Sequence, residues 1–222
     1  MVQKMQHTQY FMFGIQRSGT NYLQQLLHEN FQSVKLMNRQ GTCWKHSLEV
    51  PKGWDYGRFT FVIYKNPYTW VESMTLRNRV DWLKTQNRYP ADDLHKIDVL
   101  NVEGMNIVNL AYTWRDFHTT WLRSDVLNPR THLVIQYENL LDDQKRAKTL
   151  NTIRHLTKWD MKHPNAWVDV PLGKVSQSYN FNKKSKEYYQ KQMPQTLTKI
   201  QTGAITHAIG PNLIREMGYE IL

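Results

Sequence analysis

The sequence is poor in cysteine, in long apolar runs and in acidic residues, and each shortage excludes a class of protein. Cys43 is the only cysteine among 222 residues, which excludes an internal disulfide and a cysteine-based zinc site. No run of about 18 apolar residues occurs, so we expect no membrane-spanning helix. Residues 1–9 also lack the apolar core of a signal peptide. These features predict a soluble, cytoplasmic protein made in a reducing compartment.

The shortage of acidic residues makes the chain strongly basic. There are 29 lysines and arginines against 19 acidic residues, giving a formal net charge of +10. Such a charge favours anionic partners, which include nucleotides, acidic glycans, nucleic acid and membrane surfaces. The basic residues are spread along the chain, so we expect most of them on a solvated surface. Apolar residues make up 40% of the chain, which is enough for one domain over residues 1–222.

Residues 10–27 have the pattern of a strand, a tight turn and a helix. The apolar residues 10–13 predict the strand, and leucines at helical spacing up to Leu27 predict the helix. The polar, glycine-bounded residues 14–20 lie between them. A helix N-terminus offers unpaired N–H groups and a partial positive charge, so this loop can hold a phosphate or a sulfate.

The loop has the glycine spacing of the nucleotide P-loop, Gly-x4-Gly-Lys-Ser/Thr. Gly14 and Gly19 occupy the two glycine positions, but Thr20 replaces the lysine and Asn21 replaces the hydroxyl that holds magnesium. Arg17 places a cation inside the loop instead. The pattern therefore indicates an anion loop that is not built around a metal-bound triphosphate. An ordinary strand–helix turn with a surface arginine is the alternative.

The rest of the chain alternates between predicted strands and helices. Strands are expected at residues 33–37, 59–64 and 131–136, and helices after Asn66-Pro67 and at residues 106–122, 143–158 and 195–217, the last broken at Gly210-Pro211. An apolar stripe along residues 106–122 predicts a core face. The alternation predicts an α/β fold with a parallel sheet covered on both faces, whose ligands bind at the carboxyl ends of the strands.

Three motifs resemble those of the sulfotransferases that use 3′-phosphoadenosine 5′-phosphosulfate (PAPS). Residues 16–22, Gln-Arg-Ser-Gly-Thr-Asn-Tyr, are similar to the family's first loop, Pro-Lys/Arg-Ser-Gly-Thr-Thr/Asn-Trp/Tyr. Lys-Asn-Pro at residues 65–67, with Ser73, is similar to Arg-x-Pro with a serine eight residues after the arginine. Residues 137–140 match Tyr-Glu-Asp/Asn-Leu. The resemblance implies a three-layer α/β/α fold with a central parallel sheet, like that of P-loop nucleotide kinases.

The resemblance also implies a metal-free site for PAPS. The residues that would hold its 5′-phosphosulfate are Arg17, Ser18, Gly19, Thr20 and Asn21. Arg17 would steady the bridging oxygen as charge builds there, and Tyr22 would stack near the adenine. Gln16 departs from the family, which has proline at that position.

The 3′-phosphate and the adenine would be bound by later residues. The family motif assigns the 3′-phosphate to Lys65 and Ser73, and it brings Tyr137 near the adenine. Lys65 replaces an arginine, which keeps the charge but loses the bidentate fork. Lys183 and Lys184 lie in a basic stretch where the family closes over the 3′-phosphate, although a solvated charge run explains them equally well.

Transfer to an acceptor hydroxyl or amine needs a base, and His46 is the first candidate. It lies in the non-periodic stretch at residues 38–56, where this family often keeps its base, and a histidine accepts a proton near neutral pH. Lys45 beside it would stabilise the sulfuryl oxygens. Glu49 is the second candidate base, and a surface Lys-His pair is the alternative interpretation.

These observations predict a PAPS-dependent sulfotransferase that acts on a carbohydrate or small-molecule acceptor, without a nucleic-acid or membrane partner. No motif identifies the acceptor or an oligomeric state. An ATP-dependent small-molecule or nucleotide kinase is the enzymatic alternative, which the missing Gly-Lys-Ser/Thr triplet disfavours. A basic nucleic-acid-binding protein is the other alternative, although no known nucleic-acid module is visible.

Overall fold

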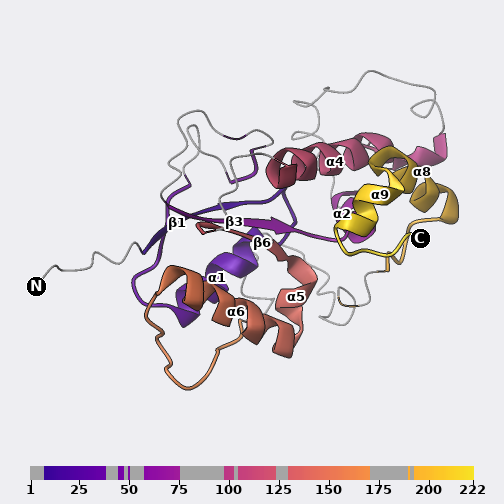
Figure 1. The fold of residues 1–222 in the computed structure, drawn as a ribbon. Coiled ribbons are helices and arrows are strands. Elements are labelled where there is room, and N and C mark those ends of the chain that lie inside the picture. The colour runs from indigo at the N-terminus through magenta and orange to yellow at the C-terminus, as the bar shows by residue number, and fades with distance from the viewer. Residues whose placement is uncertain are drawn as a thin grey trace, which may run out of the picture. The chain divides into compact units, whose positions relative to one another are not determined.

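The computed structural model describes residues 8–38, 45–47, 50, 58–75, 98–102, 105–123, 130–170, 190 and 193–222. The chain groups into two compact units (Figure 1). The first unit comprises Met1–Tyr64 and Thr120–Lys191, and the second comprises Lys65–Thr119 and Gln192–Leu222. One sulfotransferase domain over residues 1–222 stays a prediction. In the described part of the chain, no helix is long and apolar enough to cross a membrane.

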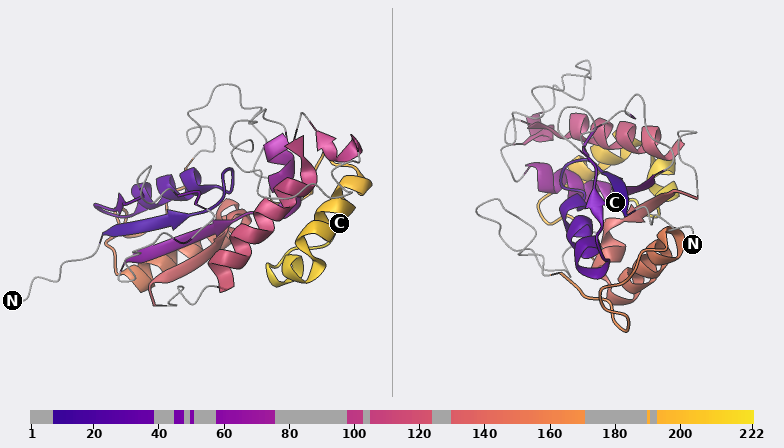
Figure 2. Two further views of the ribbon diagram at one scale, coloured as in Figure 1. Left: turned by 90° about the horizontal axis from the view of Figure 1, so that it is seen from above. Right: turned by 90° about the vertical axis from the view of Figure 1, so that its left-hand side faces the viewer.

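The first unit is built on a four-stranded parallel sheet in the order β2-β1-β3-β6, whose strands run side by side in Figure 2. The strands are β1 (Gln9–Phe13), β2 (Lys35–Leu36), β3 (Phe59–Tyr64) and β6 (His132–Gln136). Tyr10 pairs with Phe59, and Thr60 pairs with His132. Most residues of β1 and β3 are buried, as expected for central parallel strands. The predicted α/β class and the predicted strands are confirmed.

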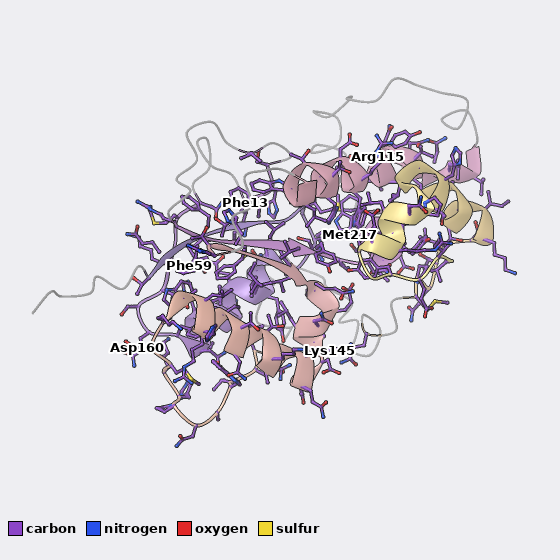
Figure 3. The ribbon with its side chains drawn as sticks, in the orientation of Figure 1. Phe13, Phe59, Arg115, Lys145, Asp160 and Met217 are labelled. Atoms are coloured by element: carbon purple, nitrogen blue, oxygen red, sulfur yellow. The ribbon has the colours of Figure 1, made fainter. Side chains whose placement is uncertain are left out.

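Helices of the first unit pack against one face of this sheet. They are α1 (Thr20–Asn30), α5 (Tyr137–Leu141) and α6 (Asp143–Thr157). Figure 1 shows α1 and α6 on the same face, and Figure 3 labels Lys145 in the first turn of α6 and Asp160 just after its end. The shared core contains Met12, Leu23, Ile63, Leu150 and Ile153. Full burial of such side chains stabilises the fold by about 1.5–3 kcal/mol each, so this core fixes α1 on the sheet.

The second unit is mainly helical. Its elements are α2 (Pro67–Thr75), η2 (Asp98–Leu100), the antiparallel pair β4 (Asn101–Val102) and β5 (Met105–Asn106), α4 (Ile107–Arg123), α8 (Lys199–Ile209) and α9 (Pro211–Glu216). The last residues of α4 belong to the first unit. Asn66 caps α2 as predicted, because its Oδ1 accepts hydrogen bonds from the backbone N–H groups of Tyr68 and Thr69 at 3.0 and 3.1 Å.

Two further predictions about these helices are confirmed. The apolar stripe of α4 is buried, including Trp114, Phe117 and Trp121. The predicted break is at Gly210, which separates α8 from α9, and Pro211 is the first residue of α9. The pair β4–β5 was not predicted, because strands of two residues leave no readable alternation in the sequence.

A buried carboxylate organises the chain that leads into α8. Glu72 of α2 is fully buried, and its Oε1 accepts hydrogen bonds from Gln195 N at 2.7 Å, Thr196 N at 2.6 Å and Thr196 Oγ1 at 2.8 Å. Hydrogen bonds to a charged group are stronger than neutral ones and compensate for its loss of hydration. Glu72 therefore fixes residues 195–196 against α2.

His118 of α4 is a buried neutral histidine. Its side chain is 0% exposed, its ring stacks on Trp114 with centroids 3.8 Å apart, and its Nδ1 donates to the Trp114 carbonyl at 2.5 Å. Burial lowers the pKa of His118 from 6.5 to about 3, although the bond to the Trp114 carbonyl opposes this shift. The folded protein therefore keeps His118 uncharged at neutral pH.

This histidine predicts acid sensitivity of the fold. Unfolded His118 takes up a proton near pH 6.5 but folded His118 does so only near pH 3, so the unfolded state binds more protons in between. Its contribution to the free energy of unfolding is complete above pH 6.5 and falls as the pH drops below it, by up to about 1.4 kcal/mol per pH unit. Urea unfolding at several pH values measures this slope.

The matched variants are His118→Asn and His207→Asn. An asparagine at position 118 can still donate to the Trp114 carbonyl but does not titrate, so this variant should lose part of the slope below pH 6.5. His207 is exposed on α8, and its replacement should leave the slope unchanged. Identical slopes in H118N and the wild type would contradict the assignment.

Candidate functional site

The loop between β1 and α1 lies at the topological switch point of the sheet, where the strand order reverses direction. Strand β2 lies on one side of β1 and β3 on the other. Ligands of open parallel sheets bind outside the carboxyl ends of the strands at this switch point. Residues 14–19 follow the carboxyl end of β1 directly, so the sheet places this loop at the expected position for a ligand.

The backbone of the loop has two left-handed residues separated by Ser18. Ser18 N donates to the Ile15 carbonyl at 3.1 Å, and both Arg17 and Gly19 have left-handed backbones, with φ of 68° and 99°. Alternation of left-handed residues with ordinary ones makes a concave nest of N–H groups that suits an anion. A left-handed arginine costs about 1 kcal/mol or more, which the rest of the loop must offset.

The first turn of α1 keeps its backbone donors available. The first intrahelical bond of this helix is donated by Leu23 N to the Gly19 carbonyl at 3.0 Å. In the described part of the chain no side chain caps the helix, and its first turn carries no acidic residue. The N–H groups before Leu23 therefore lack helical acceptors, and they form the positive end of the helix dipole.

Both glycines of the loop are required by their surroundings. A Cβ on Gly14 would lie 2.4 Å from Ser18 Oγ and 2.6 Å from Ile63 Cγ2. A Cβ on Gly19 would lie 2.2 Å from Cδ2 of Tyr137, and the φ of Gly19 is unfavourable for any other residue. The ring of Tyr137 therefore packs directly against the helix start.

Ser18 holds the polar atom of the loop that an anion fits best. Its side chain is 0% exposed, and its Oγ has no hydrogen-bond partner among the residues that the structure describes. A buried hydroxyl without a partner costs about 1–3 kcal/mol. A phosphate or sulfate oxygen in the loop would accept this hydrogen bond, so the donor set fits the 5′-phosphosulfate end of the predicted cofactor.

Lys45 and His46 are fixed to the loop from a distant part of the sequence. Gly14 N donates to the Lys45 carbonyl at 3.0 Å, and His46 Nδ1 donates to the Gly14 carbonyl at 2.6 Å. Lys45 Nζ donates to Asn21 Oδ1 at 2.5 Å, which places an ammonium group at the first turn of α1. Burial lowers the pKa of Lys45. Lys45 therefore brings to this helix the cation that Thr20 does not supply.

A tryptophan holds the same short segment on its other side. Trp121 Nε1 donates to the Ser47 carbonyl at 3.2 Å, and its ring stacks on Phe13 of β1 with centroids 4.2 Å apart (Phe13 is labelled in Figure 3). Residues 45–47 are thus attached both to the loop and to the sheet. This role of Trp121 was not predicted from the sequence, because the helical stripe indicates burial but not a hydrogen-bond partner.

The hydrogen bond to Gly14 also sets the tautomer of His46. A carbonyl oxygen only accepts, so Nδ1 of the neutral ring carries the proton and Nε2 carries the lone pair. A histidine held in this way can accept a proton at Nε2. The geometry therefore gives His46 the form that a general base requires.

The predicted residues other than Lys65 and Ser73 fall into three groups. Arg17, Ser18, Gly19, Thr20, Asn21, Lys45 and His46 are together at the loop. Tyr22 and Tyr137 are buried beside it, at 1% and 7% exposure, with ring centroids 6.2 Å apart. Glu49, Lys183 and Lys184 lie outside the described residues.

Lys65 and Ser73, predicted for the 3′-phosphate, belong to the second unit. Lys65 follows β3 directly and is 2% exposed, and its carbonyl accepts a hydrogen bond from Trp114 Nε1 at 2.9 Å. Ser73 Oγ donates to the Trp70 carbonyl at 2.7 Å. Their convergence with the loop of the first unit stays a prediction.

Comparison with known proteins found no match: no family model, curated protein or solved structure matches the chain.

Gly19→Ala should disable the loop. The new methyl group would overlap the Tyr137 ring and the φ of 99° would be strained, so we expect a loss of more than about 2 kcal/mol in the free energy of unfolding. Gly203→Ala is the matched control, because Gly203 lies inside α8 and a Cβ there meets no atom within 4 Å. That control should be stabilised by up to about 1 kcal/mol. Equal stability of both variants in urea unfolding would disprove the loop geometry.

Proposed function

We propose that the chain is a PAPS-dependent sulfotransferase, with a three-layer α/β/α architecture of the P-loop nucleotide-kinase type. Its acceptor is a hydroxyl or an amine on a carbohydrate or small molecule, and the cytoplasmic location predicted from the sequence is part of this proposal. The three sequence motifs support the family, and the parallel sheet supports the fold class.

The observation that carries the proposal is the combination of an anion loop with a cation supplied from another segment. A triphosphate-binding P-loop has its lysine within the loop motif, and this chain has Thr20 there. Lys45 is hydrogen-bonded to Asn21, at the position where a P-loop carries its magnesium-binding hydroxyl. The ammonium group of Lys45 and the amide of Asn21 therefore suit the binding of a sulfuryl group without a metal better than the binding of a metal-bound triphosphate.

The residues of the loop would hold the cofactor as follows. The backbone donors at the start of α1 and the hydroxyl of Ser18 would bind the 5′-phosphosulfate, while Arg17 and Lys45 would neutralise its charge. Lys65 and Ser73 would bind the 3′-phosphate. When bound, PAPS supplies the sulfuryl group that moves to the acceptor oxygen or nitrogen.

His46 would take the proton of the acceptor at Nε2. Its Nδ1–H remains bonded to the Gly14 carbonyl, which fixes the ring orientation and favours the imidazolium that forms. Such positioned bases typically contribute 10²–10⁴-fold to a rate. The same hydrogen bond joins His46 to the loop. The backbone of Gly14 would therefore position both the base and the bound anion.

His46→Asn separates the two roles of this side chain. An asparagine amide can donate to the Gly14 carbonyl as Nδ1 does, but it is no base at neutral pH. We expect H46N to bind adenosine 3′,5′-bisphosphate like the wild type and to transfer sulfate from labelled PAPS about 100-fold more slowly. His46→Ala should lose both properties, because it also releases the loop.

The control is His155→Ala, which removes an exposed histidine from α6. It should transfer sulfate at the wild-type rate. Unchanged transfer by H46N would remove His46 from the proposed mechanism, while the loss of bisphosphate binding in H46N would assign it a structural role instead.

A further inference from the structure

A cluster of hydrogen-bonded polar side chains connects the start of α1 to the segment that follows α6. Tyr22 is the third residue of α1 and is 1% exposed. Its hydroxyl donates to Asp169 Oδ1 at 2.7 Å and lies 3.4 Å from the Leu140 carbonyl at the end of α5. Burial and the neighbouring Asp169 both raise the pKa of Tyr22, so the hydroxyl stays protonated and acts as a donor.

Asp169 is itself held in place by a buried arginine. Nη1 of Arg146 lies 3.5 Å from Asp169 Oδ2 and donates to the Leu140 carbonyl at 3.3 Å. Nη2 of the same side chain donates to Asp143 Oδ1 at 2.8 Å. Arg146 is buried, whereas the side chains of Asp169 and Asp143 are 31% and 84% exposed, so the guanidinium is the desolvated partner of these charge-assisted hydrogen bonds. The carboxylate thus offers Tyr22 a fixed acceptor.

The segment that carries Asp169 also forms hydrogen bonds with the other end of α1. Val168 N donates to Asn30 Oδ1 at 2.7 Å, and Asn30 Nδ2 donates to the Val168 carbonyl at 2.8 Å. Tyr22 and Asn30 are about 12 Å apart along the helix at a rise of about 1.5 Å per residue. Two consecutive residues therefore hold α1 at two separated points, which restricts both sliding and rotation of the helix.

We infer that Tyr22 is a positioning residue, which acts through Asp169 to fix the first turn of α1 and thereby the anion donors of the loop. The effect of this positioning on anion binding rests on the proposed function. Donors must be held within about 0.5 Å of the productive geometry to be effective, and Tyr22 is adjacent in sequence to Asn21, which bonds Lys45. In this role the hydroxyl of Tyr22 is the essential group, whereas stacking on adenine would need only the ring.

Hydrogen exchange tests the positioning without any ligand. The variants are Tyr22→Phe, Asp169→Ala and the double variant, and Tyr10→Phe is the control. Tyr10 is also a buried tyrosine, but its hydroxyl has no hydrogen-bond partner among the described residues, so its removal breaks no bond. We expect the amides of Leu23, which donates to the Gly19 carbonyl, and of residues 24–26 to exchange about fivefold or more faster in Y22F and D169A. The double variant should exchange no faster than the faster-exchanging of the two single variants.

Faster exchange in Y22F, D169A and the double variant, but not in Y10F, supports the inference. Exchange rates in Y22F equal to those in Y10F overturn it, whatever the protein binds.

Binding of two anions then separates positioning from base stacking. Inorganic pyrophosphate has no adenine, whereas adenosine 3′,5′-bisphosphate has one. Positioning predicts that Y22F weakens both by a similar factor of about five or more. Full retention of both by Y22F, with loss of only the adenine-bearing ligand in Tyr22→Leu, overturns the positioning role. A wild-type protein that binds neither anion overturns the proposed function, and the exchange experiment still decides the inference.

Discussion

The unpaired backbone donors at the start of α1 are the constraint on which the rest of the site depends. A helix cannot satisfy its first N–H groups internally, and the described part of this chain supplies no side-chain cap for them. The surrounding residues instead make this place positive. Gly19 lets the ring of Tyr137 close against the helix start, and Lys45 brings an ammonium group to its first turn. These features support the proposed anion site over an ordinary turn.

Several parts of the first unit contribute to holding that site still. The parallel sheet fixes β1, and Trp121 attaches residues 45–47 to Phe13 at the end of that strand. The Gly14 peptide exchanges hydrogen bonds with Lys45 and His46. The proposed base and the proposed anion loop are therefore held at the same residue. Group transfer needs such preorganisation, because positioning and charge neutralisation do most of the work.

Local patterns predicted most of the secondary structure, while side-chain partnerships escaped prediction. The apolar run of β3, the Asn66 cap and the break at Gly210 depend on neighbouring residues and were therefore readable. The bonds of Lys45 to Asn21 and of Tyr22 to Asp169 join residues far apart in the chain, and no spacing rule encodes them. For the same reason, the sequence indicated which residues could bind an anion but not which group would orient His46.

Calorimetric titration of the wild-type protein with adenosine 3′,5′-bisphosphate in the absence of magnesium tests the central claim most directly. Parallel titrations with 5′-AMP and with magnesium–ATP provide the comparison. The account predicts micromolar or tighter binding of the bisphosphate and much weaker binding of 5′-AMP, because two separate phosphate sites are engaged. No binding of the bisphosphate together with clear binding of magnesium–ATP would contradict the account, favour a kinase and remove the roles proposed for Lys65 and Ser73.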